Sequence, residues 1–418
     1  MEPTLIVTCG VLWDGTAAHP IDDGVVVISR DRFTAAGART KVPLPVGSAV
    51  QTLAFPGSTV LPGLIDTHVH LIWPGDGTLA HQYTPAASDA ELLLTAIRNA
   101  RLALGAGVTT LRDVGSRGRI VLELRDAIAR ESMLGPRIIT SGAPITISGG
   151  HMHYLGGEAD TASDIRRVAR RLWRDGVDFF KMVLNGGGTP RTHPWIPSYN
   201  PAEIDVAVEE ARAHETYVVV HANAHEAIQR AVSRGVTAIE HCTFLRGPKD
   251  VVFEPRLVES MASRRVIVGH TLQAGYLSLK RACGQWASLT IAEREYWDTR
   301  RRIFEAQSSN SKRLVEMGVR LAASTDAGWS LNPFGEYWRA MDLLVQAGVS
   351  PIQALRTGTV TAAEALGLDA QLGTITPGKV ADLVVVDGNP TVEITDLRRV
   401  RAVVKSGCVA VHDGKFVA

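Results

Sequence analysis

Apolar runs and amphipathic stretches alternate through the middle of the chain. The stretches at 89–107, 163–176 and 201–215 repeat apolar residues at i, i+3, i+4 and i+7, as amphipathic helices do. Eight β/α units in series predict an α/β protein whose core is a (β/α)8 TIM barrel. The eight apolar runs typical of its buried strands occupy residues 60–71, 109–115, 137–145, 178–186, 216–222, 237–242, 266–272 and 320–328.

The two ends of the chain differ from the middle and resemble each other. Residues 4–55 and 373–416 contain short alternating apolar runs separated by Gly, Asp and Pro, which is typical of antiparallel strands with tight turns. Each end is too short to bury a good core alone, so we expect the two to combine. The predicted domains are one β-sandwich built from 1–57 and 369–418, and a barrel formed by 58–368.

A long segment, residues 273–319, separates the seventh and eighth predicted strands. Its sequence is helical in pattern and contains two tryptophans and several arginines. A lid over the barrel mouth and a contact between subunits are both consistent with this pattern.

Composition narrows the class of protein. Of the 418 residues, 45% are hydrophobic and 21% charged, which is typical of a soluble globular enzyme. A net charge of +1 argues against nucleic acid or an acidic membrane as the main partner, and no apolar run is long enough to span a membrane. The 4 cysteines show no CxxC spacing, and the N-terminal residues do not resemble a signal peptide. We therefore expect a cytoplasmic protein with a small-molecule substrate.

One lysine interrupts an apolar run. Residues 178–188 read DFFKMVLNGGG, with Lys181 inside a predicted strand that is buried on both faces. Lysine is rarely buried because its charge is costly to remove from water. A stem that extends to the surface at the strand end would explain the residue, and so would a role at the barrel mouth.

Metal-capable side chains stand at the carboxyl ends of other predicted strands. His68 and His70 end the first strand, His221 the fifth, His241 the sixth and Asp326 the eighth. In a barrel these ends meet at one face, and residues i and i+2 of a strand point the same way. Taken singly, a histidine here is explained by core packing, and the aspartate by a turn cap. Taken together with the lysine, the set favours a metal site.

Several motifs identify a resemblance. The sequence is similar to the amidohydrolase superfamily, and within it to the imidazolonepropionase-like and prolidase-like metal-dependent amidohydrolases. The resemblance covers nearly the whole chain. The matching motifs are PGLIDTHVH at 62–70, GVTTLRDVG at 107–115, Lys181, the stretch 220–241, STDAG at 324–328 and 372–390.

The resemblance implies a ligand set. His68 and His70 would hold the more buried of two divalent metal ions together with Asp326, and His221 and His241 the second. The lysine would carry a CO2-derived carboxylate that bridges both ions, and His and oxygen ligands suit zinc. Imidazolonepropionases lack this lysine and use one metal, so its presence argues against that activity. The resemblance also implies a homo-oligomer.

The chemistry that follows is hydrolysis. We expect a metal-bridging hydroxide to attack an amide-type carbonyl while Asp326 transfers a proton to the leaving nitrogen. A metal-dependent esterase or lactonase is the first alternative, because the same hydroxide attacks esters. A catalytically inactive binding relative is the second, although such relatives usually lose ligands that this chain retains.

The residues expected to bind substrate are less marked. His151 and His153 lie in the glycine-rich stretch SGGHMH, of which we favour His151, and His270 ends the seventh strand without a matching motif. Asn223 stands where some prolidase-like members have a tyrosine, and this departure argues against simple dipeptidase activity. The candidate substrates are N-acyl amino acids, dipeptide-like compounds, aryl amides, carbamates and ureas. Asp113 is expected to form structural hydrogen bonds. The aromatic residues expected in an aromatic-accepting pocket or an oligomer interface are Trp195, Trp329, Phe334, Tyr337 and Trp338.

Overall fold

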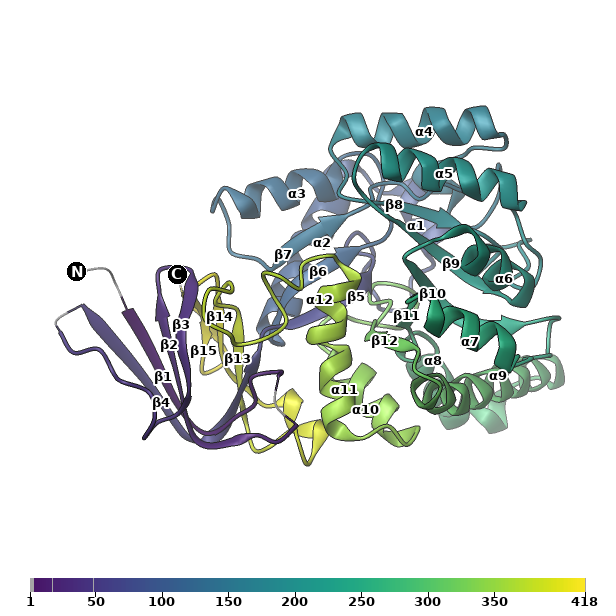
Figure 1. Cartoon of the computed structure of the whole chain (residues 1–418). Coiled ribbons are helices and arrows are strands. Elements are labelled where there is room, and N and C mark those ends of the chain that lie inside the picture. The colour runs from purple at the N-terminus through teal and green to yellow at the C-terminus, as the bar shows by residue number, and fades with distance from the viewer. Residues whose placement is uncertain (1–3, 17, 48, 418) are drawn as a thin grey trace.

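The computed structural model describes residues 4–16, 18–47 and 49–417, and its central part is α/β (Figure 1). All eight predicted central strands are present and pair in parallel. They form a three-stranded sheet in the order β5-β6-β7 and a five-stranded sheet in the order β12-β11-β10-β9-β8. Their bounds are β5 (Leu64–Val69), β6 (Val108–Asp113), β7 (Arg137–Thr140), β8 (Phe180–Val183), β9 (Val218–Ala224), β10 (Ala238–Leu245), β11 (Ile267–His270) and β12 (Arg320–Ala323).

Isolated bridges join the two sheets at both pairs of edges. Val69 pairs in parallel with Ala327, which connects β5 to the residues after β12. Ile145 pairs in parallel with Met182, which connects the residues after β7 to β8. Neighbouring central strands all run in the same direction, so their carboxyl ends lie at one face of the two sheets.

Helices follow the central strands, and capping residues mark the starts of α4 and α5. Asn200 and Glu203 form a capping box ahead of Pro201 at the start of α5, and the Thr161 side chain accepts a hydrogen bond from the Asp164 N–H at the start of α4. Among the described residues, no helix is long and apolar enough to cross a membrane. The helices are α1 (Ala80–Ala86), α2 (Asp89–Gly105), α3 (Ile120–Ala129), α4 (Ala162–Asp175), α5 (Pro201–Ala213), α6 (His225–Arg234), α7 (Pro255–Ser263), α8 (Gln273–Gly284), α9 (Ile291–Glu316), α10 (Trp338–Gln346), α11 (Pro351–Thr357) and α12 (Val360–Ala365).

Both ends of the chain contribute to one eight-stranded sheet. Its order is β16-β15-β14-β13-β4-β1-β2-β3, and β4 pairs antiparallel with β13 where the two ends meet (Figure 1). A shared core includes Phe33 and Phe55 from the N-terminal part and Leu383 and Val404 from the C-terminal part. The bounds are β1 (Thr4–Leu12), β2 (Ile21–Ser29), β3 (Arg32–Ala38), β4 (Val50–Pro62), β13 (Leu383–Asp387), β14 (Val400–Lys405), β15 (Cys408–His412) and β16 (Lys415–Phe416).

Two details of this sheet differ from the expected pattern of antiparallel strands. β1 and β4 pair in parallel, with Thr4 opposite Val50, because the chain returns to the start of β1 after the β2–β3 hairpin. β4 also continues to Pro62, beyond the division predicted at residues 57 and 58. The strand therefore passes from the terminal sheet directly toward β5.

Candidate metal centre

His68 and His70 both direct their Nε2 atom toward the carboxylate of Asp326. The Nδ1 of His68 lies 2.7 Å from Glu240 Oε2, and the Nδ1 of His70 lies 3.2 Å from the Gly115 carbonyl. Both Nε2 atoms stand 3.4 Å from Asp326 Oδ1. Because an acceptor at Nδ1 holds the proton there, each Nε2 is left with its lone pair free for a metal. These three residues form a buried group with the ligand spacing of a metal site.

A buried ion pair behind His68 was not predicted from the sequence. Arg112 donates from Nη2 to Glu240 Oε1 at 2.8 Å, and its Nε and Nη1 donate to the carbonyls of Thr67 and Ala365. Neither Arg112 nor Glu240 is exposed to solvent. A charged pair inside TLRDVG and AIEHC was the available signal, since an ion in such an apolar strand needs a partner.

Asp326 is held in the loop after β12 by a second carboxylate. Its N–H donates to the His68 carbonyl at 2.8 Å, and its φ of 59° is in the left-handed region. Asp66 accepts hydrogen bonds from both the N–H and the hydroxyl of the preceding Thr325. Burial raises the pKa of Asp66 to about 7, and burial also raises the pKa of Asp326 well above its usual range, against the effect of the Lys181 charge.

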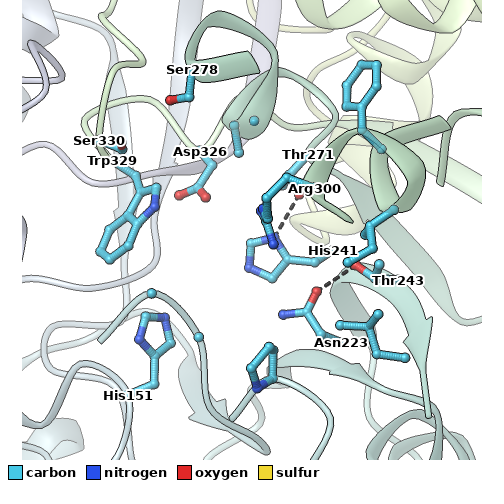
Figure 2. Close-up of a pocket in the computed structure, with 18 of the residues that line it drawn as sticks. His151, Asn223, His241, Thr243, Thr271, Ser278, Arg300, Asp326, Trp329 and Ser330 are labelled. Carbon is cyan, nitrogen blue, oxygen red and sulfur yellow. Dashed lines mark hydrogen bonds between the residues drawn. The ribbon is translucent and has the colours of Figure 1, made fainter. Parts of the chain in front are cut away.

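His221 and His241 form the second half of the cluster. Their ring centroids are 4.5 Å apart, and the His241 ring is 5.0 Å from that of His68. The Nδ1 of His241 lies 2.7 Å from the Thr271 hydroxyl, as Figure 2 shows. Burial, reinforced by the charges of neighbouring groups, lowers the pKa of both histidines well below its usual range. Both rings are therefore neutral at pH 7, the state in which imidazole binds metals.

Lys181 lies in β8 and lines the same cavity. It is 1% exposed, so its stem does not extend to the surface as a snorkelling lysine would. Its Nζ has no hydrogen-bond partner among the residues that the structure describes. Burial lowers its pKa to about 8, so the amine is neutral in about one molecule in ten at pH 7. A buried amine without a partner, next to neutral imidazoles and a carboxylate, fits a centre of two divalent ions with a carboxylated lysine.

Two glycines after β8 allow aromatic side chains to approach the centre. A Cβ on Gly187 would lie 2.5 Å from the His151 ring, and one on Gly188 would lie 2.2 Å from Trp329. The Nδ1 of His151 lies 2.9 Å from the Thr189 hydroxyl, and burial lowers its pKa to about 3. The glycine run that follows the lysine strand thus admits two residues from other loops.

The cluster lines a cavity of about 770 Å³. Of the residues expected to bind substrate, His151 and Asn223 line it, and Figure 2 shows both directed inward. The Asn223 amide lies 3.0 Å from His221 Nε2 and accepts a hydrogen bond from Thr243.

Two of the expected substrate residues lie elsewhere. The His153 side chain is 40% exposed, and its Nδ1 lies 3.9 Å from Glu158 Oε1, outside the described cavity lining. His270 is buried, and its Nε2 forms a hydrogen bond with the Ser311 hydroxyl of α9 instead of lining the cavity. A strand-end position alone did not distinguish a packing contact from a site contact.

The remaining predicted residues divide between cavity and core. Asp113 accepts hydrogen bonds from the N–H groups of Leu71 and Gly115, the structural role expected for it. Trp195 and Trp329 line the cavity. Phe334 and Tyr337 are buried in the core, and Trp338 lines a separate hollow beside α2.

Comparison with known proteins gives consistent matches. The amidohydrolase family model matches residues 59–411. The ochratoxinase of Aspergillus niger is 25% identical over 433 residues, covering 95% of this chain and 84% of the relative. The imidazolonepropionase of Symbiobacterium thermophilum is 23% identical, covering 95% of this chain and 92% of the relative. A solved Xaa-Pro dipeptidase with bound methionine matches with a TM-score of 0.85 at 25% identity, covering 97% of this chain and 99% of that one.

Proposed function

The chain belongs to the amidohydrolase family of hydrolases, and we propose that it cleaves an amide-type C–N bond with the help of two divalent metal ions. Relatives named ochratoxinase and Xaa-Pro dipeptidase support N-acyl amino acids and dipeptide-like amides as the substrate class. Aryl amides, carbamates and ureas belong to the same proposal. The observation that carries it is the buried, unpartnered Nζ of Lys181 in a cavity lined by His68, His70, His221, His241 and Asp326.

The proposal extends to the framework of the site. The two bridged parallel sheets support a closed (β/α)8 barrel over 58–368, with the ligands at its mouth. The terminal sheet, which encloses its own core, supports a β-sandwich built from 1–57 and 369–418. The proposal also includes a homo-oligomer, which rests on the family resemblance, and a cytoplasmic location, which rests on the scattered cysteines.

The ligands divide into two groups. His68, His70 and Asp326 would hold one ion, His221 and His241 the other, and a carboxylated Lys181 would bridge them; zinc suits these donors. When bound, the ions polarise the substrate carbonyl and lower the pKa of water at the site. The neutral lysine amine captures CO2 by forming an N–C bond and releasing one proton, which gives the carbamate its negative charge.

Side chains of the protein transfer the proton and hold the histidine rings in position. Asp326 accepts a proton from the attacking water and delivers it to the leaving nitrogen, which departs as an amine. Burial raises the pKa of Asp326 well above its usual range, which makes this carboxylate a stronger proton acceptor than an exposed aspartate. Glu240 forms a hydrogen bond with Nδ1 of His68, and Thr271 forms one with Nδ1 of His241. Neither ring therefore has to reorient during turnover.

The test is chemical labelling of the lysine. Protein supplied with ¹³C-bicarbonate should show one carbamate carbon signal by ¹³C NMR, and Lys181→Ala should abolish this signal. The variant should also bind less zinc, and a short-chain acid such as propionate should restore part of the bound metal and of the hydrolysis. Lys405→Ala is a matched control, because burial also lowers the pKa of Lys405, which lies in β14 of the terminal sheet.

The proposed metal pair and the proposed type of bond cleaved can be refuted separately. A single zinc per chain, or wild-type metal content in Lys181→Ala, would refute the bridged pair. A panel of N-acyl amino acids, aryl amides, ureas, esters and lactones tests the bond that is cleaved. Turnover of esters and lactones without turnover of any amide would refute the amide assignment and establish the esterase alternative.

A further inference from the structure

One face of α9 forms a wall of the cavity. Arg300, Ile303, Phe304 and Gln307 all line it, at the spacing of i, i+3, i+4 and i+7 that places side chains on one side of a helix. The Gln307 amide donates to the His241 carbonyl at 3.0 Å, which attaches this face to the candidate metal centre. The segment 273–319 therefore takes part in the site as a wall of the cavity.

Arg300 stands on this face without a partner of opposite charge. Its side chain forms neither a hydrogen bond nor an ion pair with the described residues, although Glu295 of the same helix also lines the cavity. Arg300 is one of the residues that line the cavity, and Figure 2 draws its side chain in front of Thr271 and His241 in this view. The next residue, Arg301, forms ion pairs with Asp298 and Glu305 at the surface. An unpaired guanidinium directed into a cavity is a ready site for an anion.

The rest of the wall is apolar and aromatic. Leu279 of α8 and Tyr296, Trp297 and Phe304 of α9 line the cavity beside the arginine. A volume of about 770 Å³ is in the range of cavities that enclose drug-sized ligands. The wall thus offers one planar cation for an anionic group and a large apolar surface for the remainder of the ligand.

We infer that Arg300 anchors a carboxylate of the substrate, and that the substrate is an amide with a free carboxylate near the scissile bond and a bulky apolar acyl group. This inference rests on the proposed function and narrows its substrate class. Arginine binds carboxylates through two parallel N–H···O bonds, a geometry that a neutral urea or carbamate does not offer. Lys249, which also lines the cavity, adds a second positive charge.

The test separates binding from turnover. Dansyl-L-phenylalanine and its primary amide are sulfonamides, so the enzyme should bind them without cleaving an amide bond between acyl group and amino acid. The acid should bind the wild-type protein about 10- to 100-fold more tightly than the amide, as expected for a charge-assisted pair. Arg300→Met should remove most of this preference, and Arg300→Lys should keep a part of it. Arg301→Met is the matched control and should keep all of it.

Hydrolysis provides the second measurement. With N-(2-naphthoyl)-L-phenylalanine, Arg300→Met should raise KM about 10-fold or more with kcat changed by less than about 3-fold. If the acid and the amide bind equally, if neither binds, or if Arg300→Met retains the preference, the anchor is refuted even where hydrolysis proceeds. If the acid binds through Arg300 but no amide is ever cleaved, the proposed function fails and the anchor stands.

Discussion

Replacing Glu240 by glutamine tests how the buried ion pair controls His68. The carboxylate of Glu240 accepts from two donors, Arg112 Nη2 at 2.8 Å and His68 Nδ1 at 2.7 Å. A glutamine offers one acceptor and one donor, so in either orientation an NH2 group faces another N–H. The Glu240 carboxylate lies close against the Gly269 backbone, because a Cβ added to this glycine would be 1.9 Å from Glu240 Oε2.

The least costly solution is a change of tautomer. If His68 moves its proton from Nδ1 to Nε2, then Nδ1 can accept from the glutamine, and the Nε2 proton points to Asp326 Oδ1 at 3.4 Å. The same Nε2 can no longer bind a metal. We therefore expect Glu240→Gln to fold and to lose about 10- to 100-fold in zinc affinity, which is about 1.4–2.7 kcal/mol.

The substitution also affects stability, because Arg112 loses its counter-charge in a fully buried position. Removing one partner of a buried pair costs about 3–5 kcal/mol, and glutamine should cost less because it still accepts one hydrogen bond. The assays are zinc competition with a fluorescent chelator and urea unfolding of the metal-free protein. Glu210→Gln is the matched control, since Glu210 is a buried carboxylate paired with Arg166 and Arg170 on the outer helices.

The outcomes separate the two effects. The control should lose stability and keep the wild-type zinc affinity. If Glu240→Gln binds zinc as tightly as the wild type while losing stability like the control, the ion pair serves the fold alone. The argument about the tautomer of His68 would then be wrong.

Two further predictions concern proton transfer and acid stability. Asp326→Asn should lower kcat about 10²- to 10⁴-fold with KM changed by less than about 3-fold, in steady-state assays on the best amide of the panel; near-normal turnover would exclude Asp326 as the proton carrier. Burial lowers the pKa of His270 from 6.5 to about 4. Below pH 6.5 the unfolded chain therefore binds a proton that the native state refuses, and stability falls by about 3 kcal/mol down to pH 4. His270→Gln, which can still bond to Ser311, should show a correspondingly smaller fall by urea unfolding at several pH values. His412→Gln at the partly exposed β15 should fall as the wild type does, and parallel slopes for all three proteins would contradict the assignment.

Much of the fold could be predicted because its signals are local. Each central strand is a short apolar run, and many of the intervening helices show their own periodicity or cap, so the elements were identified without knowledge of their neighbours. The parallel pairing of β1 with β4 was not predicted, because it depends on where the chain returns after a whole hairpin. The alternation within these segments indicates strands joined by tight turns, whereas the neighbour that each strand takes is decided between segments.

The site was predictable in its residue types and less so in its contacts. The HxH pair follows from the period of two in a strand, and the distant histidines follow from strand ends that meet at one face. His270 satisfied the same positional rule, and His153 was expected from its glycine-rich loop. Neither lines the described cavity, because the contacts of each are set by packing: Glu158 for His153 and Ser311 of α9 for His270.

The sequence by itself determined which atoms are available at the mouth of the central sheets: imidazoles, a carboxylate and one amine that burial makes reactive. The tertiary structure decided what those atoms do. Glu240, which lies 172 positions from His68 in the chain, selects the nitrogen of His68 that faces the centre. Arg300 lines the same cavity from α9, and not from one of the strands that carry the proposed metal ligands. The physical reason is that hydrophobic patterning is a property of a segment, whereas the direction of a hydrogen bond and the isolation of a charge are properties of packed neighbours.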